Sequence, residues 1–257
     1  MSFDVPAQAY DHFMGRYSRL LAPLFADFSG VGSDGTALDV GCGPGALTGV
    51  LIDRLGLEQV SAVDPSRPFV DAIRQRHPGL DVQVAGVESL PFESGRFDRA
   101  LAQLVVHHLA DPVAGIAEMA RVTRDGGTVA ACVWDHAGGV SPLGPFWAAV
   151  REFDPAAPGE ASFPGSREGH LVEIFELADL EEVRGEGIDF SAHLESFDDW
   201  WEPYPLGVGP AGRYVADLAP DRRHELEELC REQLPDGPFD LPLRVWGARG
   251  VVGPQTM

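Results

Sequence analysis

The sequence predicts an α/β protein built around a mostly parallel sheet. From residue 36 to about residue 133, short β-rich runs alternate with amphipathic helical stretches, which is typical of parallel strands joined by crossover helices. The β-rich runs are nearly continuous in apolar residues, as strands covered on both faces are. With 257 residues, 44% of them hydrophobic, the chain has enough material for one sizeable core, so we expect a single domain over residues 1–257.

Five runs are predicted as the parallel strands: TALDV (36–40), VSAVD (60–64), DVQVA (81–85), FDRALAQL (97–104) and GTVAACVW (127–134). Between the first two, Leu47, Leu51 and Leu55 form the apolar stripe of a helix that packs on the sheet. A second helix is expected to begin with Asp111 as its N-cap and Pro112 as its first residue, and to end before the turn at 125–127.

The second half of the chain has a different character. The segment after residue 135 is rich in Gly and Pro, and a helix is expected near residues 171–178. A strand is expected over about 181–194, and its apolar phase changes near Gly185 and Gly187, which predicts a bulge there. A final strand alternates over 239–245. We therefore expect two insertions, 136–168 and 195–236, that form a cap, followed by the final strand and tail, 237–257.

Charge and composition exclude several classes of protein. A net charge of −21 repels phosphate backbones, so nucleic acid is not an expected partner. The chain has no apolar run long enough to span a bilayer and no secretory leader pattern, so we expect a cytoplasmic protein without a membrane partner. Cys42, Cys132 and Cys230 are widely spaced, so we expect neither a disulfide nor a metal site.

A glycine-rich loop joins the first predicted strand to the following helix: Gly41-Cys42-Gly43-Pro44-Gly45. Glycine at such a turn permits positive φ and lets the backbone approach a ligand. The spacing GxGxG differs from the GxGxxG of dinucleotide-binding folds, which favours a ligand without a diphosphate and disfavours a nucleotide-dependent oxidoreductase. The alternative is a tight turn with a structural role only.

Asp64 ends the second predicted strand about 20 residues past this loop, where a carboxylate can bind both ribose hydroxyls. The alternative is that Asp64 caps the helix that begins near Ser66, Arg67 and Pro68.

Five segments together resemble a known family. LDVGCGPG, VDPS, ESLPF, the Phe97-Asp98 pair and VVHHLADP are similar to motifs of the class I S-adenosylmethionine-dependent methyltransferases, of the small-molecule, UbiE-like kind. The resemblance covers roughly the first 135 residues. It implies S-adenosylmethionine as cofactor, S-adenosylhomocysteine as product and a Rossmann-like, seven-stranded, mostly parallel sheet whose last strand is antiparallel, with helical cap insertions. It also implies an N-terminal helical cover (1–30) on a cofactor-binding core (31–135).

The resemblance assigns cofactor contacts position by position. The methionine portion is expected near Asp39, Gly41 and Gly43, the ribose at Asp64 with Pro65 beside it, the adenine at Glu88 and Ser89, and the transferable methyl group near Gln103. Arg16 is expected to bind the cofactor carboxylate, with Tyr10 and Tyr17 as aromatic cover, unless these three only pack the N-terminal helix. The sequence departs from the family at Gly86, where an Asp is common, so an acceptor for the adenine amino group is missing at that position.

His107 and His108 follow the fourth strand at the ligand-binding end of the sheet, where one of them is positioned to act as a general base. Trp134, Asp135 and His136 follow the fifth strand at the same end, with Asp135 as a further catalytic candidate and the other two in the substrate pocket. The alternative is that His107 only lines the pocket and His108 packs under the sheet edge, so that neither takes part in the chemistry.

Trp200, Trp201 and Tyr204 form an aromatic cluster in the second insertion, suited to closing over a flat or apolar substrate as part of a mobile segment. The alternative is that they form the core of the cap.

We expect methyl transfer to a small-molecule acceptor by a monomer or homodimer. The alternative hypothesis is a non-catalytic protein that binds the cofactor as a regulatory ligand or uses the fold as a scaffold. The acceptor atom is not encoded in any motif.

Overall fold

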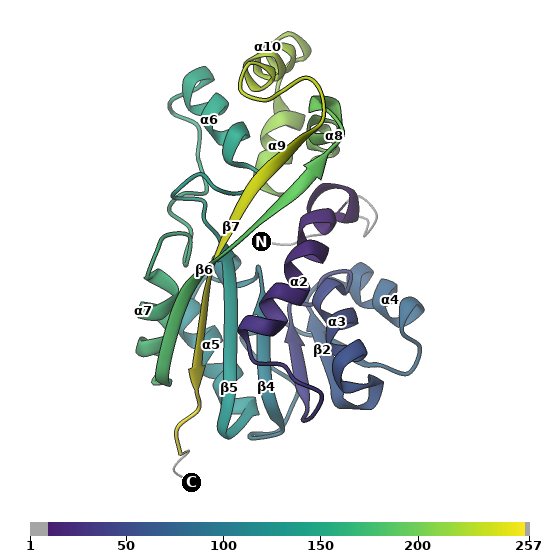
Figure 1. The fold of residues 1–257 in the computed structure, drawn as a ribbon, viewed down its shortest axis with the longest axis vertical. Helices are drawn as coiled ribbons and strands as arrows, with labels where there is room; N and C mark the ends of the chain where they lie inside the picture. The colour runs from purple at the N-terminus through teal and green to yellow at the C-terminus, as the bar shows by residue number, and fades with distance from the viewer. Residues whose placement is uncertain (1–9, 255–257) are drawn as a thin grey trace.

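The computed structural model describes residues 10–254, and its centre is a seven-stranded sheet in the order β3-β2-β1-β4-β5-β7-β6 (Figure 1). The strands are β1 (Ala37–Val40), β2 (Val60–Asp64), β3 (Asp81–Val84), β4 (Phe97–Gln103), β5 (Thr123–Trp134), β6 (Glu181–Leu194) and β7 (Phe239–Val251). Strands β1 to β5 pair in parallel, and β7 pairs antiparallel with both β5 and β6. The prediction of a mostly parallel sheet with an antiparallel last strand is therefore confirmed.

Helices cover both faces of the sheet. The residues of α2 (Arg16–Phe28), α3 (Ala46–Leu55) and α4 (Arg67–Arg76) enter one hydrophobic cluster, and those of α5 (Pro112–Val122) and α7 (His170–Leu177) enter the other. Residues 10–254 also contain four short helical turns: η1 (Asp11–Gly15), η2 (Leu57–Gln59), η3 (Val106–His108) and η4 (Tyr204–Leu206). The first nine residues of the predicted N-terminal cover and the last three of the predicted tail lie outside the described residues.

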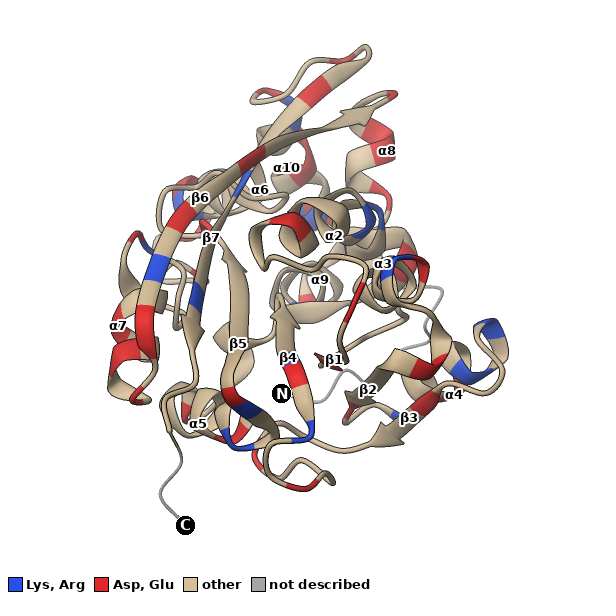
Figure 2. Ribbon diagram, turned by 60° about the horizontal axis from the view of Figure 1, so that its bottom comes forward, with Lys and Arg blue, Asp and Glu red and all other residues tan. Residues whose placement is uncertain are grey.

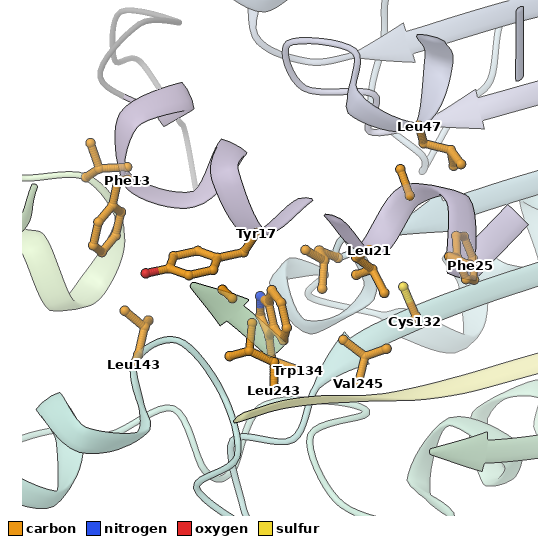
Figure 3. Packing of buried hydrophobic residues seen from close by; sticks show 14 of the residues in the cluster. Phe13, Tyr17, Leu21, Phe25, Leu47, Cys132, Trp134, Leu143, Leu243 and Val245 are labelled. Carbon is orange, nitrogen blue, oxygen red and sulfur yellow. The ribbon is translucent and has the colours of Figure 1, made fainter. Parts of the chain in front are cut away.

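Alternation along β5 divides the core between the two faces. Ala130, Cys132 and Trp134 pack with α2, while the residues between them pack with α5 and α7. Figure 3 shows the α2 side of this core, where Tyr17 and Leu21 lie against residues of β5 and β7. Because the second half of β5 is buried on both faces, its residues 129–134 are all apolar.

The predicted start of α5 matches the structure, whereas residues 125–127, predicted as the turn between the helix and the fifth strand, lie within β5. The Asp111 carboxylate accepts a hydrogen bond from the Ala114 backbone N–H at 2.9 Å, and Pro112 is the first helical residue, which confirms the N-cap. After the helix, the chain passes Gly126 at φ 72°, and the register between β4 and β5 shifts between Phe97 and Arg99.

The bulge in β6 is real, but its predicted position was wrong. The register with β7 shifts between Glu181 and Arg184, where Glu182 has φ 49°, and it is regular from Arg184 onward. The glycines serve another purpose, because a Cβ at Gly185 would collide with Val172 of α7, and one at Gly187 would lie 3.2 Å from the Trp246 ring. They allow close packing of neighbours and do not mark the bulge.

Four helices gather at one end of the sheet, around the outer ends of β6 and β7 (Figure 1). Helix α6 (Gly144–Phe153) lies in the first predicted insertion, and α8 (Phe197–Trp201), α9 (Gly209–Asp217) and α10 (Pro220–Arg231) lie in the second. We call these four helices and η4 the cap. Its residues share the cluster that includes α2, so the cap is continuous with the core on that face.

Within residues 10–254, no helix combines the length and the hydropathy that a membrane span requires. The three cysteines are buried and free. Acidic residues are spread along α7, β6 and α8 (Figure 2).

Candidate active site

The glycine loop is held tightly between neighbouring segments. The backbone N–H groups of Gly41 and Cys42 both donate to the carbonyl of Val63, at 2.8 and 3.0 Å. Gly41 has φ 70°, and a Cβ added there would lie 2.5 Å from Cγ2 of Val105. Position 41 therefore requires glycine both for its backbone conformation and for its packing.

Asp64 holds the loop from the end of β2. Its carboxylate accepts one hydrogen bond from the Gly43 N–H at 2.9 Å and another from the Ser66 N–H at 2.7 Å. Helix α4 has Ser66 as its N-cap, so Asp64 is not the cap of that helix. Burial raises the pKa of Asp64, and the two N–H donors oppose this rise. Each carboxylate oxygen has a second lone pair for a ligand hydroxyl.

A cavity of about 240 Å³ opens beside this loop, at the carboxyl ends of β1, β2 and β4. We call it the loop cavity. It lies where the strand order reverses, between β1 and β4, which is the usual ligand site of open α/β sheets. Of the residues predicted to bind a cofactor, six line it: Gly41, Gly43, Asp64, Pro65, Glu88 and Gln103.

The apolar part of this wall escaped the sequence analysis. Phe69, Val87 and Leu109 line the loop cavity, and the rings of Phe69 and Tyr10 lie 5.2 Å apart. Such side chains form a slot for a flat base. Their only sequence signal is that Phe69 and Leu109 closely follow the ends of β2 and β4.

Two features test whether the loop cavity fits S-adenosylmethionine. Gly43 has φ 53° and faces open space, with no atom within 4 Å of an added Cβ, so the ligand side of the loop is free of side chains there. Gln103 donates through Nε2 to the Ser18 carbonyl at 3.1 Å, while its buried Oε1 has no hydrogen-bond partner among the described residues. A ligand with an amino group supplies the donor that this oxygen lacks, so the residues fit the cofactor.

The open space at Gly43 gives a direct test. In Gly43→Val, a branched side chain enters the loop cavity, and we expect loss of measurable S-adenosylhomocysteine binding by calorimetry while unfolding stays cooperative. Gly169→Val is the matched control, because Gly169 also has positive φ (77°) and open space but lies outside the loop cavity. Equal affinity in the two variants would restrict Gly43 to a role in the turn.

Glu88 changes the interpretation of Gly86. A Cβ at Gly86 would collide with the Glu88 carboxylate, and both residues line the loop cavity. The Glu88 carboxylate therefore occupies the space above Gly86 that a side chain would otherwise fill. The acceptor missing at position 86 is replaced by one that reaches back from position 88.

Asp39 lines a smaller cavity of about 30 Å³, which shares Gly41, Gly43 and Gln103 with the loop cavity. Burial raises the pKa of Asp39 to about 7, while a 2.6 Å hydrogen bond from the Thr48 hydroxyl opposes the rise. Asp39 thus lies beside the glycine loop, and its expected contact with the methionine portion of the cofactor stays a prediction.

A second cavity, of about 50 Å³, adjoins the loop cavity, and the two share Tyr10, Leu104 and His108. We call it the histidine cavity. Its wall includes the histidine cluster, which we define as His107, His108 and His136; Trp134 also lines it. The rings of His107 and His108 lie 3.8 Å apart, and those of His107 and His136 lie 5.7 Å apart.

Burial and mutual repulsion keep the histidine cluster uncharged. Burial lowers the pKa of His107 well below its ordinary value, that of His108 to about 4 and that of His136 to about 3. An imidazole-like step near pH 6.5 is therefore not expected from these residues in the free protein. The cluster offers neutral rings that can accept a hydrogen bond.

Glu160 is a cavity residue that the sequence analysis missed. It lies in the Gly- and Pro-rich first insertion, lines the histidine cavity and is only 4% exposed. The Trp147 indole N–H donates to its Oε2 at 2.6 Å, and burial raises the pKa of Glu160 to about 7. Its surroundings in the sequence suggest an exposed loop, and no spacing pattern indicates otherwise.

Several predicted site residues line none of these three cavities. Arg16 forms an ion pair with Asp199 of α8 at 2.9 Å and donates to the Asp199 carbonyl, so its charge is used to join α2 to the cap. The Asp135 carboxylate accepts from the Gly138 N–H at 2.8 Å in a turn. Ser89 is exposed, in a turn where its N–H donates to the Gly86 carbonyl.

The predicted aromatic cluster lies inside the cap. Trp200 and Tyr204 are 2% and 1% exposed, and both donate to the Pro142 carbonyl, at 3.0 and 3.4 Å. Trp201 stacks on Tyr204 with ring centroids 5.4 Å apart. The structure therefore places these rings as packing between the two insertions, while Val208 to Ala211 supply the cap's wall of the histidine cavity.

No metal cluster arises from this arrangement: residues 10–254 contain no group of three or more His, Cys, Asp or Glu side chains placed to hold a metal ion.

Comparison with known proteins finds a family model and relatives that each match part of the chain. Residues 38–131 match the family model described as a methyltransferase domain. The chain is 33% identical over 129 residues to the malonyl-[acyl-carrier protein] O-methyltransferase of Pseudescherichia vulneris, a match that covers 50% of each protein. Matches to the curated relatives span between 20% and 50% of those proteins' lengths.

Solved structures extend the likeness of fold to most of the chain. A Bacillus halodurans protein assigned as a methyltransferase superposes with a TM-score of 0.59 at 14% identity, over 91% of this chain and 99% of that one. The geranyl diphosphate C-methyltransferase of Streptomyces coelicolor, solved with S-adenosyl-L-homocysteine, gives a TM-score of 0.50 at 17% identity, over 93% and 80%. Residues 38–131 therefore match a methyltransferase domain, in a chain whose fold is that of the solved methyltransferase structures.

Proposed function

We propose that the protein transfers a methyl group from S-adenosylmethionine to a small-molecule acceptor. The observation that carries this proposal is the junction of two cavities. The loop cavity has the residues that fit the cofactor, and the histidine cavity meets it at Tyr10, Leu104 and His108. An acceptor in the second cavity would thus lie beside a cofactor in the first.

Different residues of the loop cavity contact different parts of the cofactor. Asp64 accepts hydrogen bonds from the ribose hydroxyls, and Gly41, Gly43 and Asp39 surround the methionine portion. Glu88 accepts from the adenine amino group, within the slot formed by the apolar side chains named above. When bound, the cofactor supplies a methyl group on a positively charged sulfur, which is electrophilic without further activation.

The protein also contributes by positioning the acceptor and by excluding water from the histidine cavity. Holding an acceptor in line with the methyl group can supply about 7 to 11 kcal/mol of barrier lowering. The histidine cavity is lined by Phe13, Leu143 and Trp134 beside its polar groups, which limits the access of water. The neutral rings of the histidine cluster can accept a hydrogen bond from the methyl acceptor and so orient it.

The test combines binding with turnover. Calorimetry with S-adenosylmethionine and S-adenosylhomocysteine should give saturable binding, and a panel of small amines, phenols, thiols and acids should release S-adenosylhomocysteine with at least one class. Tight cofactor binding without turnover across such panels would favour a regulatory binding protein. Absence of binding to both forms would contradict the proposal.

The net charge leads to a prediction about nucleic acid. We expect no measurable binding of tRNA or duplex DNA at about 0.15 M salt, where the Debye length is about 8 Å and only close basic contacts hold a phosphate backbone. Fluorescence anisotropy at several salt concentrations measures this. Binding that weakens steeply with salt would instead place nucleic acid among the substrates.

A further inference from the structure

The histidine cavity contains a carboxylate, that of Glu160, to which the described lining residues offer no cationic partner. Glu160 is almost completely buried, and within residues 10–254 its carboxylate accepts a hydrogen bond from the Trp147 indole, a neutral group. The residues that line the cavity include no arginine, and the chain has no lysine. A buried carboxylate is costly unless a cation or several donors compensate it, so the cavity lacks a positively charged or donor-rich group.

The neighbouring rings add acceptors to the same wall. Neither ring nitrogen of His136 has a hydrogen-bond partner among the described residues, and the same holds for Nδ1 of His107. A neutral imidazole carries one N–H and one lone pair, so these rings offer lone pairs to a donor in the cavity. An ammonium group carries several N–H donors on one atom, and carboxylate and imidazole acceptors together can satisfy them.

The charge of the whole protein favours the same ligand. The net charge of −21 attracts cations toward the surface and repels anions. A carboxylate or phosphate brought next to Glu160 would place like charges together in a dry cavity. The long-range and local charges thus both select against an anionic acceptor.

We propose that the methyl acceptor is a small amine whose nitrogen binds Glu160 in the histidine cavity. This proposal rests on the proposed function, because it names the acceptor class for the same pair of cavities. The cavity of about 50 Å³ has room for roughly three to five water-sized groups, at about 10 to 15 Å³ each. An amino group at the end of a short carbon chain fills it, and methyl transfer requires that this nitrogen reach the junction with the loop cavity at Tyr10, Leu104 and His108.

Methyl transfer to such an amine balances without another reactant. The ammonium first gives one proton to the Glu160 carboxylate, which leaves a nitrogen lone pair. That lone pair forms the new N–C bond while the C–S bond breaks, and its electrons stay on sulfur. The products are the N-methylammonium ion and S-adenosylhomocysteine.

The test compares three probes of nearly equal size with different charge. Calorimetry with n-butylamine, 1-butanol and butyrate, each in the presence of saturating S-adenosylhomocysteine, measures the preference at pH 8. We expect n-butylamine to bind at least tenfold more tightly than 1-butanol, and butyrate to bind more weakly than either. Glu160→Gln should bring the affinities for amine and alcohol within about twofold.

Glu160→Asp is the matched conservative variant, because it keeps the charge on a shorter side chain, and we expect it to retain a preference for the amine. Affinity for S-adenosylhomocysteine, measured in every variant, reports that the domain is folded. If the wild type binds S-adenosylhomocysteine but does not prefer the amine, or if Glu160→Gln keeps the preference, the amine proposal is overturned while the proposed function stands. If the wild type does not bind S-adenosylhomocysteine, both proposals fail.

The pH dependence of binding supplies a second readout. Burial raises the pKa of Glu160 to about 7, so the carboxylate ionises between pH 6 and 8, and affinity for n-butylamine should rise across that interval. The other titratable groups near it do not ionise there: the pKa values of the histidine cluster are lowered by burial, and those of Tyr10 and Tyr204 are raised by burial. A flat profile in Glu160→Gln supports the proposal, whereas an unchanged rise contradicts it.

Discussion

Asp64→Ala should weaken the binding of S-adenosylhomocysteine by about 1.5 to 3 kcal/mol, which is roughly ten- to 150-fold in Kd. Two losses contribute. The ribose hydroxyls lose a charged acceptor, and the Gly43 N–H loses the 2.9 Å hydrogen bond that holds the glycine loop. Calorimetric titration of the wild type and the variant measures the difference.

Asp98→Ala is the matched control for this prediction. Asp98 also accepts a backbone hydrogen bond, from the Thr36 N–H at 2.7 Å, and it pairs with Arg124 at 2.7 Å, but it lies outside the loop cavity. We expect lower stability with unchanged cofactor affinity. If both variants weakened binding equally, the effect would be a general loss of stability and the ribose contact would be refuted.

Trp200→Ala should lower the free energy of unfolding by about 3 to 5 kcal/mol, as truncation of a large buried side chain does. For a protein of this size, the loss corresponds to a fall in Tm of roughly 6 to 20 °C. The indole is 2% exposed, packs against Tyr204 with ring centroids 4.8 Å apart and donates to the Pro142 carbonyl of the other insertion. Chemical denaturation and a thermal scan measure both quantities.

This experiment decides between a fixed cap and a mobile segment over residues 195–236. Leu206→Ala is the control, because Leu206 is 52% exposed in the same segment, and its loss should change stability by less than about 0.5 kcal/mol. An unchanged Tm in Trp200→Ala together with a higher KM for the acceptor would identify the segment as a lid that closes on the substrate.

The strands and the cofactor loop could be predicted because their causes are local. A strand such as β5 is covered by helices on both faces, so its residues 129–134 are apolar throughout. Gly43 and Asp64 stand at strand ends separated by a regular βα unit, so their spacing alone places them together. The hydrogen bond between them is a direct result of that spacing.

The remaining features depend on partners distant in sequence. Arg16 was expected to bind the cofactor carboxylate, but it forms an ion pair with Asp199, which is 183 residues away in the sequence. Glu160 lies in a sequence segment that is typical of an exposed loop. It is buried because Trp147 and the cap pack around it. The bulge at Glu182 was displaced in the prediction, because glycines needed for close packing were taken as signs of irregular backbone.

The position of β7 in the sheet also governs the order in which the chain can fold during synthesis. Residues up to 134 contain all five parallel strands, which pair with one another in the order β3-β2-β1-β4-β5. Strand β6 forms the sheet edge, and β7, made last, lies between it and β5. On the ribosome, β6 and the cap that follows it must wait until residues 239–251 emerge, because β7 joins β6 to the rest of the sheet. A chain that stalls shortly before residue 239 would therefore hold a formed parallel sheet with β5 as an open edge, exposed to pairing with another chain.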